Sequence, residues 1–124
     1  MNYLGIDYGD KHIGIAQSSG TIATGLLSVP TAEAISRIKQ LVEKNDIDCC
    51  VIGLPSGSMK KQVEAFSKQL HTAIPIKIIL WDETLSSFSA RESLSATNLS
   101  TKNRKNKEHQ VAAAAILQSY LDSL

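Results

Sequence analysis

The chain has 124 residues, with a hydrophobic content of 43% and a charged content of 20%, which are ordinary values for a globular protein. This length predicts a single domain over residues 1–124. No apolar run approaches the ~20 residues of a membrane helix, and the N-terminus lacks the pattern of a secretory signal. We therefore expect a cytoplasmic protein without membrane contact. The net charge of +1 does not by itself indicate nucleic-acid binding.

The first part of the chain predicts three strands and a helix. Residues 2–8 and 12–17 are apolar stretches on either side of a glycine-containing turn, which is typical of a hairpin. Residues 21–29 are rich in small and β-branched side chains and predict a third strand, which Pro30 ends. A helix is expected over residues 31–45, with Thr31 as its N-cap. Its inward face carries Ile35, Ile38, Leu41 and Val42.

Residues 47–54 predict a strand that is covered on both faces, because the run is almost continuously apolar. Cys49 and Cys50 are adjacent in it. Neighbouring residues of a strand point to opposite faces, so these two thiols are poorly placed to bond each other. We expect them to be small core residues of a protein in a reducing compartment, not metal ligands.

The second part of the chain continues the alternation. A helix is expected over 60–71, a strand over 76–81, a short helix over 86–97, a polar loop over 98–106 and a last helix over 107–124. Val63, Phe66 and Leu70 form the inward face of the first of these helices. Strand–helix–strand repeats indicate right-handed parallel crossovers. The order predicts an α/β fold, in which an antiparallel meander continues into parallel strands and helices cover both faces.

Asp7 is the first candidate site residue. It lies near the end of the first apolar strand, where a carboxylate is costly to bury without a partner. That partner is commonly a metal ion, or a phosphate held through a metal. Asp7 could instead cap the turn that follows, as Asp often does. Chains of this layout bind ligands at the C-terminal ends of parallel strands, which favours a functional role.

Further candidates lie later in the chain. Asp82 and Glu83 are carboxylates at the end of an apolar strand, as Asp7 is, and they are candidate site residues for the same reason. Helix capping or an ion pair would also explain them. His109 begins the predicted last helix, where a histidine can equally be a surface residue. A basic run could hold phosphates or could be a solvated loop. It consists of Lys102, Arg104, Lys105 and Lys107.

Grouped carboxylates repel one another, so a cation is expected where these side chains converge. Hard oxygen ligands favour Mg²⁺ or Mn²⁺ over zinc. Two such ions about 4 Å apart can activate a water and stabilise the leaving oxygen of a phosphodiester. The acidic strand ends therefore suggest phosphodiester chemistry.

These residues resemble the motifs of the YqgF/RuvX family, and the resemblance covers nearly the whole chain. It rests on Gly5-Ile6-Asp7-Tyr8-Gly9 with Gly14-Ile15-Ala16, on Ile52-Gly53-Leu54-Pro55, on Asp82-Glu83-Thr84-Leu85-Ser86-Ser87, on Ser100-Thr101-Lys102 with the basic run, and on Ala112-Ala113 with Ile116-Leu117-Gln118-Ser119-Tyr120-Leu121. Members are described as pre-16S rRNA nucleases or Holliday junction resolvases with a ribonuclease H-like fold. The resemblance implies a five-stranded mixed sheet and metal-dependent cleavage of structured nucleic acid.

The resemblance also implies roles for residues and partners. Asp7 and Glu83, with Asp82 next to it, are the expected metal ligands, and Mg²⁺ or Mn²⁺ is the expected cofactor. The expected partners are precursor rRNA or branched DNA, together with the ribosome, and the protein is expected to be a monomer or a homodimer. Processing of precursor 16S rRNA is the first functional hypothesis, and resolution of Holliday junctions is the alternative.

Two departures from the family pattern stand out. The family usually has Asp where this chain has His109, counting back from Ile116-Leu117. Imidazole can bind Mn²⁺ or orient a water, but it is a weaker Mg²⁺ ligand than carboxylate. We expect His109 to occupy the third position of the metal site, with Asp7 and Glu83 as its catalytic partners. The loop after Pro55 is also shorter than family members often have.

Two other classes of function remain open. Asp7-Tyr8-Gly9 followed by Gly14 also resembles the phosphate loop of actin-like and sugar-kinase ATPases, although those folds enclose ATP between two domains and this chain has room for one. A non-catalytic module that binds RNA or the ribosome is the second, and His109 makes it more credible.

Overall fold

The computed structural model describes the backbone of residues 1–82 and 101–124 and the side chains of residues 1–82 and 108–124. The predicted helix over 86–97, part of the predicted loop over 98–106, and Glu83 lie outside the described residues. None of the helices in the described part of the chain is long and apolar enough to cross a membrane.

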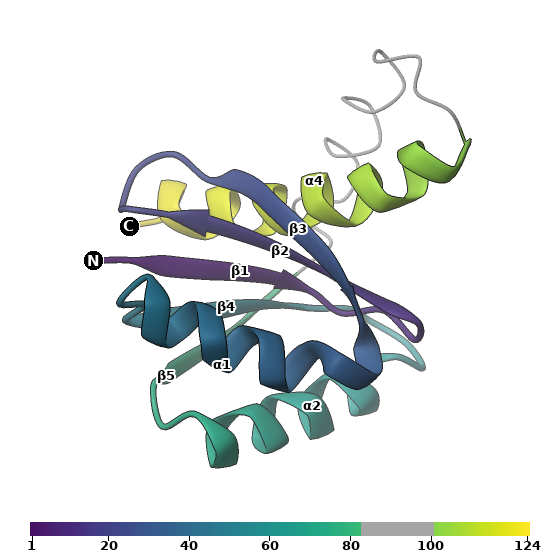
Figure 1. The fold of residues 1–124 in the computed structure, drawn as a ribbon, viewed down its shortest axis with the longest axis horizontal. Helices are drawn as coiled ribbons and strands as arrows, with labels where there is room; N and C mark the ends of the chain where they lie inside the picture. Colours follow the sequence, from purple (N-terminus) through teal and green to yellow (C-terminus); the bar gives the residue numbers. More distant parts are fainter. Residues whose placement is uncertain (83–100) are drawn as a thin grey trace.

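A mixed five-stranded sheet forms the centre of the molecule (Figure 1). Its strands are β1 (Tyr3–Asp7), β2 (His12–Ser18), β3 (Thr24–Pro30), β4 (Cys49–Leu54) and β5 (Lys77–Asp82). Their order across the sheet is β3-β2-β1-β4-β5. The first three strands are antiparallel to one another, whereas β1, β4 and β5 are parallel. This confirms the predicted meander that continues into a parallel part.

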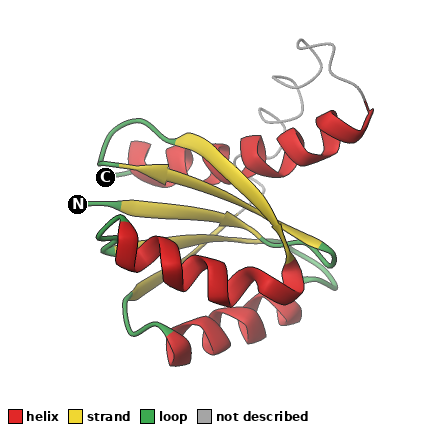
Figure 2. Cartoon of the chain, viewed as in Figure 1, coloured by secondary structure: helices red, strands yellow, loops and turns green. Residues whose placement is uncertain are grey.

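Helices cover both faces of the sheet, as predicted (Figure 2). The helix α1 (Ala34–Lys44), which follows the short 3₁₀ helix η1 (Thr31–Glu33), and the helix α2 (Lys60–Ala73) lie on one face. The long helix α4 (Thr101–Asp122) lies on the other. The core is correspondingly divided into two buried clusters, one on each side of the sheet. Cys50 belongs to the first and Cys49 to the second, which confirms that these thiols point to opposite faces.

The predicted inward faces of the helices are confirmed. Val63, Phe66 and Leu70 of α2 are buried, as are Ile38 and Val42 of α1. Burial of these apolar side chains against the sheet supplies most of the stabilisation of helices of this length.

Two local predictions are wrong. The basic run does not lie in a loop, because α4 begins at Thr101 and includes it. Thr31 does not cap α1, since its hydroxyl instead donates a 2.7 Å hydrogen bond to the carbonyl oxygen of Gly9. Both errors come from reading polar residues as local loop or cap signals, and for Thr31 a long-range hydrogen bond replaces the cap.

Glycines on the sheet let α4 approach the strands closely. A Cβ on Gly5 would lie 2.7 Å from the Ala113 carbonyl oxygen, and one on Gly14 would overlap the backbone of His109. Gly5 pairs with Ala16 and Ala16 with Gly25, so small residues form a row across three strands. The helix α4 therefore packs closely on this part of the sheet at His109, Gln110 and Ala113, which fixes the position of His109 above the sheet.

Candidate active site

Asp7 is the last residue of β1, the central strand of the sheet. Its side chain is only 12% exposed, so the carboxylate has lost most of its contact with water and needs a polar or charged partner. The parallel strands β4 and β5 end at the same edge of the sheet, and the antiparallel strand β2 begins there. The predicted placement of Asp7 at this edge is confirmed.

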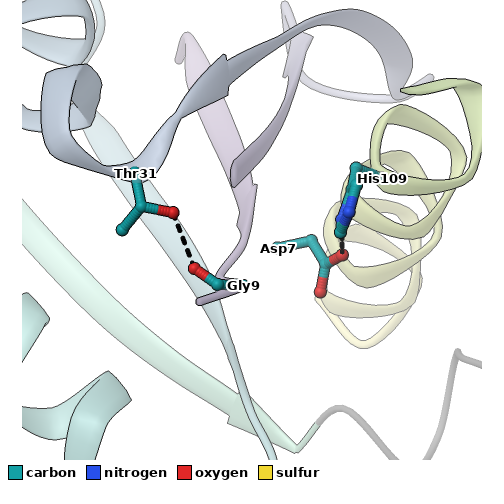
Figure 3. Close-up of polar contacts among 4 residues, drawn as sticks. All are labelled: Asp7, Gly9, Thr31 and His109. Atoms are coloured by element: carbon teal, nitrogen blue, oxygen red, sulfur yellow. Dashed lines mark hydrogen bonds and ion pairs between the residues drawn. The ribbon is translucent and has the colours of Figure 1, made fainter. Parts of the chain in front are cut away.

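His109 is the side chain that interacts with Asp7. Its Nδ1 lies 3.3 Å from Oδ2 of Asp7, across 102 residues of sequence, and the two side chains point toward each other (Figure 3). Gly14 makes this contact possible, because it pairs with Asp7 in the sheet and leaves room for the α4 backbone at His109. The predicted meeting of a strand-end acid with His109 is thus confirmed.

The electrostatics of His109 differ from expectation. The sequence predicts His109 at the start of the last helix, a position where the helix dipole would favour neutral imidazole. That expectation is wrong, because α4 begins eight residues earlier at Thr101. Instead, the hydrogen bond to Asp7 raises the pKa of His109 above its ordinary value, partial burial opposes this, and the charges of Asp7 and Glu108 add to the rise.

The loop between β1 and β2 is held against the start of η1. Thr31 donates its backbone N–H to Lys11, 2.9 Å away, in addition to the hydroxyl bond to Gly9. A Cβ on Gly9 would lie 2.5 Å from the carbonyl oxygen of His12, so this tight loop requires glycine there. These contacts fix the backbone that directly follows Asp7.

His12 is a neighbour of the site that sequence reasoning missed. Its ring centroid is 6.5 Å from that of His109, with 33° between the ring planes. It is exposed at the start of β2, two residues before Gly14. The glycine-rich sequence around His12 predicts a turn and carries no signal for the role of this side chain.

Asp82 does not share the face of the sheet on which Asp7 lies. Trp81 faces α4, because its indole N–H donates a 3.0 Å hydrogen bond to Ser119. Side chains alternate along a strand, so Asp82 starts from the opposite face of the sheet. Among the described residues, no group of three or more His, Cys, Asp and Glu side chains could hold a metal ion. Glu83 remains a prediction as the second acidic ligand.

The pair of Asp7 and His109 is compatible with a divalent ion. Oδ2 of Asp7 and Nδ1 of His109 lie 3.3 Å apart, so both atoms could face one ion. The donor set of one carboxylate and one imidazole suits Mn²⁺ better than Mg²⁺. Asp7 and His109 therefore fit part of a metal site, and Glu83 is the expected further ligand.

The basic run occupies the first two turns of α4 and precedes His109 in the same helix. Lys102, Arg104 and Lys105 come from the same helical segment, and Lys107 lies two residues before His109. Their attachment to the helix that carries His109 is consistent with a phosphate-binding role, which stays a prediction.

The fold is that of resolvase-type nucleases with a ribonuclease H-like sheet. T. thermophilus RuvC in complex with a Holliday junction substrate matches with a TM-score of 0.58 and 11% sequence identity, over 99% of this chain and 95% of RuvC. A Fowlpox virus resolvase, solved with Holliday junction DNA, matches with a TM-score of 0.57 and 14% identity, over 99% of this chain and 98% of the resolvase.

The sequence narrows this class to one family. The family model described as "RuvX: Holliday junction resolvase" matches residues 1–123, so the chain belongs to the RuvX family. A protein of Thermoanaerobacter pseudethanolicus named "Putative pre-16S rRNA nuclease" is 38% identical, over 99% of this chain and 97% of its own length. A Bacillus subtilis protein of the same name is 36% identical, over 100% of this chain and 99% of its own length.

Proposed function

We propose that this chain is a metal-dependent endonuclease that cuts structured nucleic acid in the cytoplasm, and that its substrate is precursor 16S rRNA. The contact between Asp7 and His109 at the C-terminal edge of the sheet carries this proposal. A carboxylate and an imidazole meet there in a fold shared with resolvases. The names of the full-length relatives support precursor rRNA as the substrate. Membership of the RuvX family favours a nuclease over the ATPase alternative.

Asp7, Glu83 and His109 would hold Mg²⁺ or Mn²⁺. When bound, such an ion supplies a water of lowered pKa and neutralises charge on the phosphate. Asp7 keeps the imidazole of His109 oriented, because Nδ1 is held against Oδ2. Without an ion, the one-third exposed ring of His109 can hold a proton beside Asp7; with an ion bound, the ring would serve as a ligand instead. The basic run at the start of α4 would position the phosphate backbone.

Cleavage assays test the proposal directly. Precursor 16S rRNA and a four-way DNA junction should be incubated with wild type and with Asp7→Asn, in Mg²⁺ and in Mn²⁺. We expect metal-dependent cleavage of the RNA by wild type, with a preference for Mn²⁺, and none by Asp7→Asn. Equal cleavage by the two proteins would contradict the role of Asp7.

Resolution of Holliday junctions is the second candidate function. It is favoured by the description of the family model and by the likeness to resolvases solved with junction DNA. Cleavage of the junction but not of the RNA would select it. Tight RNA binding by wild type without cleavage in either metal would instead select a non-catalytic binding module.

A further inference from the structure

A hollow lies beside the candidate active site, on the opposite face of the sheet from α4. It encloses about 380 Å³ between the start of α1 and the helix α2. The rings of Tyr8 and Phe66 line it, with centroids 5.1 Å apart and 49° between their planes. Its rim carries the amides of Gln62 and Gln69.

The sequence keeps this hollow open with small side chains. Ala32 and Ala65 line it from opposite helices, and both are exposed. Gln62, Ala65 and Gln69 are spaced by three and four residues, so they share one face of α2. A larger residue at Ala65 would fill the space between the helices.

The hollow is connected to the site through the backbone. Tyr8 directly follows Asp7, so their Cα atoms are about 3.8 Å apart. Asp7 faces α4, whereas Tyr8 packs against the cluster on the other face. The bonds from Thr31 to Gly9 and Lys11 hold this loop in place. Nucleic acid bound at Asp7 would reach the hollow by crossing this edge of the sheet, where Tyr8 directly follows Asp7.

The lining selects a flat, neutral ligand with polar edges. None of the residues that line the hollow is charged, so a phosphate or a carboxylate would find no counter-charge there. Aromatic rings provide a stacking surface, and a glutamine amide offers both a donor and an acceptor. A nucleobase combines a π-face with such an edge. The volume of 380 Å³ leaves room for a single base with water around it.

We propose that this hollow receives one unpaired base of the strand whose phosphate lies at Asp7. The base stacks against Tyr8, and Gln62 and Gln69 meet its polar edge. This assignment rests on the proposed function, in that nucleic acid runs past Asp7. It gives the protein a means of selecting strands with an unpaired base next to the cleaved bond.

Short single-stranded RNAs with 2-aminopurine at successive positions test the assignment in EDTA. We expect wild type to quench the fluorescence at one position, because the base stacks on an aromatic ring. Removing the base at that position should weaken binding by about tenfold or more. Ala65→Phe fills the hollow and should abolish both effects. Ala73→Phe, an equal change at an exposed position at the end of the same helix, should retain them.

A second variant and a second ligand make the result decisive. Ala32→Phe closes the hollow from the other side and should behave like Ala65→Phe, even if one of the two variants folds poorly. Equal quenching by wild type and both filled variants would overturn the assignment. Adenosine monophosphate that binds as tightly as the RNA would also overturn it, by showing a site for free nucleotides.

The outcomes separate this assignment from the nuclease proposal. If binding depends on the base and is lost in Ala65→Phe, but the protein cleaves nothing, the result would support base binding in the hollow and contradict the proposed nuclease activity. If wild type and Ala65→Phe cleave with the same KM and binding does not depend on the base, the result would support the nuclease activity and contradict base binding in the hollow.

Discussion

Asp7 is a nearly buried carboxylate, and the imidazole of His109 is its described partner. The raised pKa of His109 means that the folded protein binds a proton there more tightly than the unfolded chain does. The pair therefore stabilises the fold fully below the unfolded pKa of about 6.5. That contribution is lost as the pH rises through the higher pKa of the folded state.

We expect His109→Asn to destabilise the protein more at pH 5 than at pH 9 when a chelator is present. The difference should not exceed about 1 kcal/mol, because the side chain of His109 is 34% exposed and water screens the pair. Urea unfolding of both proteins across this pH range measures it. His71→Asn, at an exposed position of α2 away from Asp7, is the control. A larger loss at pH 9 than at pH 5 would contradict the ion pair.

Gly14 is the residue on which the position of His109 depends. A Cβ there would overlap the backbone of His109, whereas one on Gly25 would lie 3.1 Å from Cβ of Gln110. We expect Gly14→Ala to cost about 1–3 kcal/mol by overpacking and Gly25→Ala to cost less. Thermal unfolding gives both values. Equal losses would show that α4 shifts freely on the sheet.

At the scale of elements, α4 joins the basic run to the site. Cations in the first turns of a helix oppose its dipole, and the first turn of α4 contains no acidic residue. The basic run is therefore unfavourable for the helix itself, which is consistent with a functional reason for its presence.

Replacing Lys102 and Lys105 with Ala should weaken binding to all nucleic-acid sequences alike. It should also flatten the dependence of log K on log salt by up to about two units. The melting temperature should not fall, because the helix start loses an unfavourable charge. Binding measured over a salt series, with Lys39→Ala and Lys44→Ala on α1 as the control, tests this. Unchanged affinity would show that the run is only solvated.

The same helix shows where prediction from sequence fails. Polar residues between 98 and 106 predict a loop, yet residues from Thr101 onward are helical. The later turns of α4 carry an apolar face, in which Ala113, Ile116, Leu117 and Leu121 are buried, whereas the sequence of its first two turns is polar. Helix starts remote from the core have no hydrophobic pattern to mark them.

At the scale of the whole molecule, the strands were predictable because each is an apolar run ended by turn residues. The parallel crossovers followed from their alternation with helices. The position of Asp7 at the end of β1 was predictable, because it closes an apolar run before a glycine-containing turn. The bonds of Thr31 and the hollow beside Tyr8 were not, since they join residues that are distant in sequence and that share no local pattern.

A final prediction concerns the stability of the whole fold. An ion that binds only the folded protein stabilises it by mass action, by about 2.7 kcal/mol at a concentration of one hundred times Kd, and so raises the melting temperature. We expect Mn²⁺ to raise the melting temperature of wild type by several degrees and to leave Asp7→Asn unchanged. His109→Ala should show a smaller rise, because one ligand is lost. Glu43→Gln, which removes an equal charge from the exposed face of α1, should behave like wild type. The same Mn²⁺ shift in wild type and Asp7→Asn would place the ion elsewhere and remove the basis for metal-dependent cleavage at this edge of the sheet.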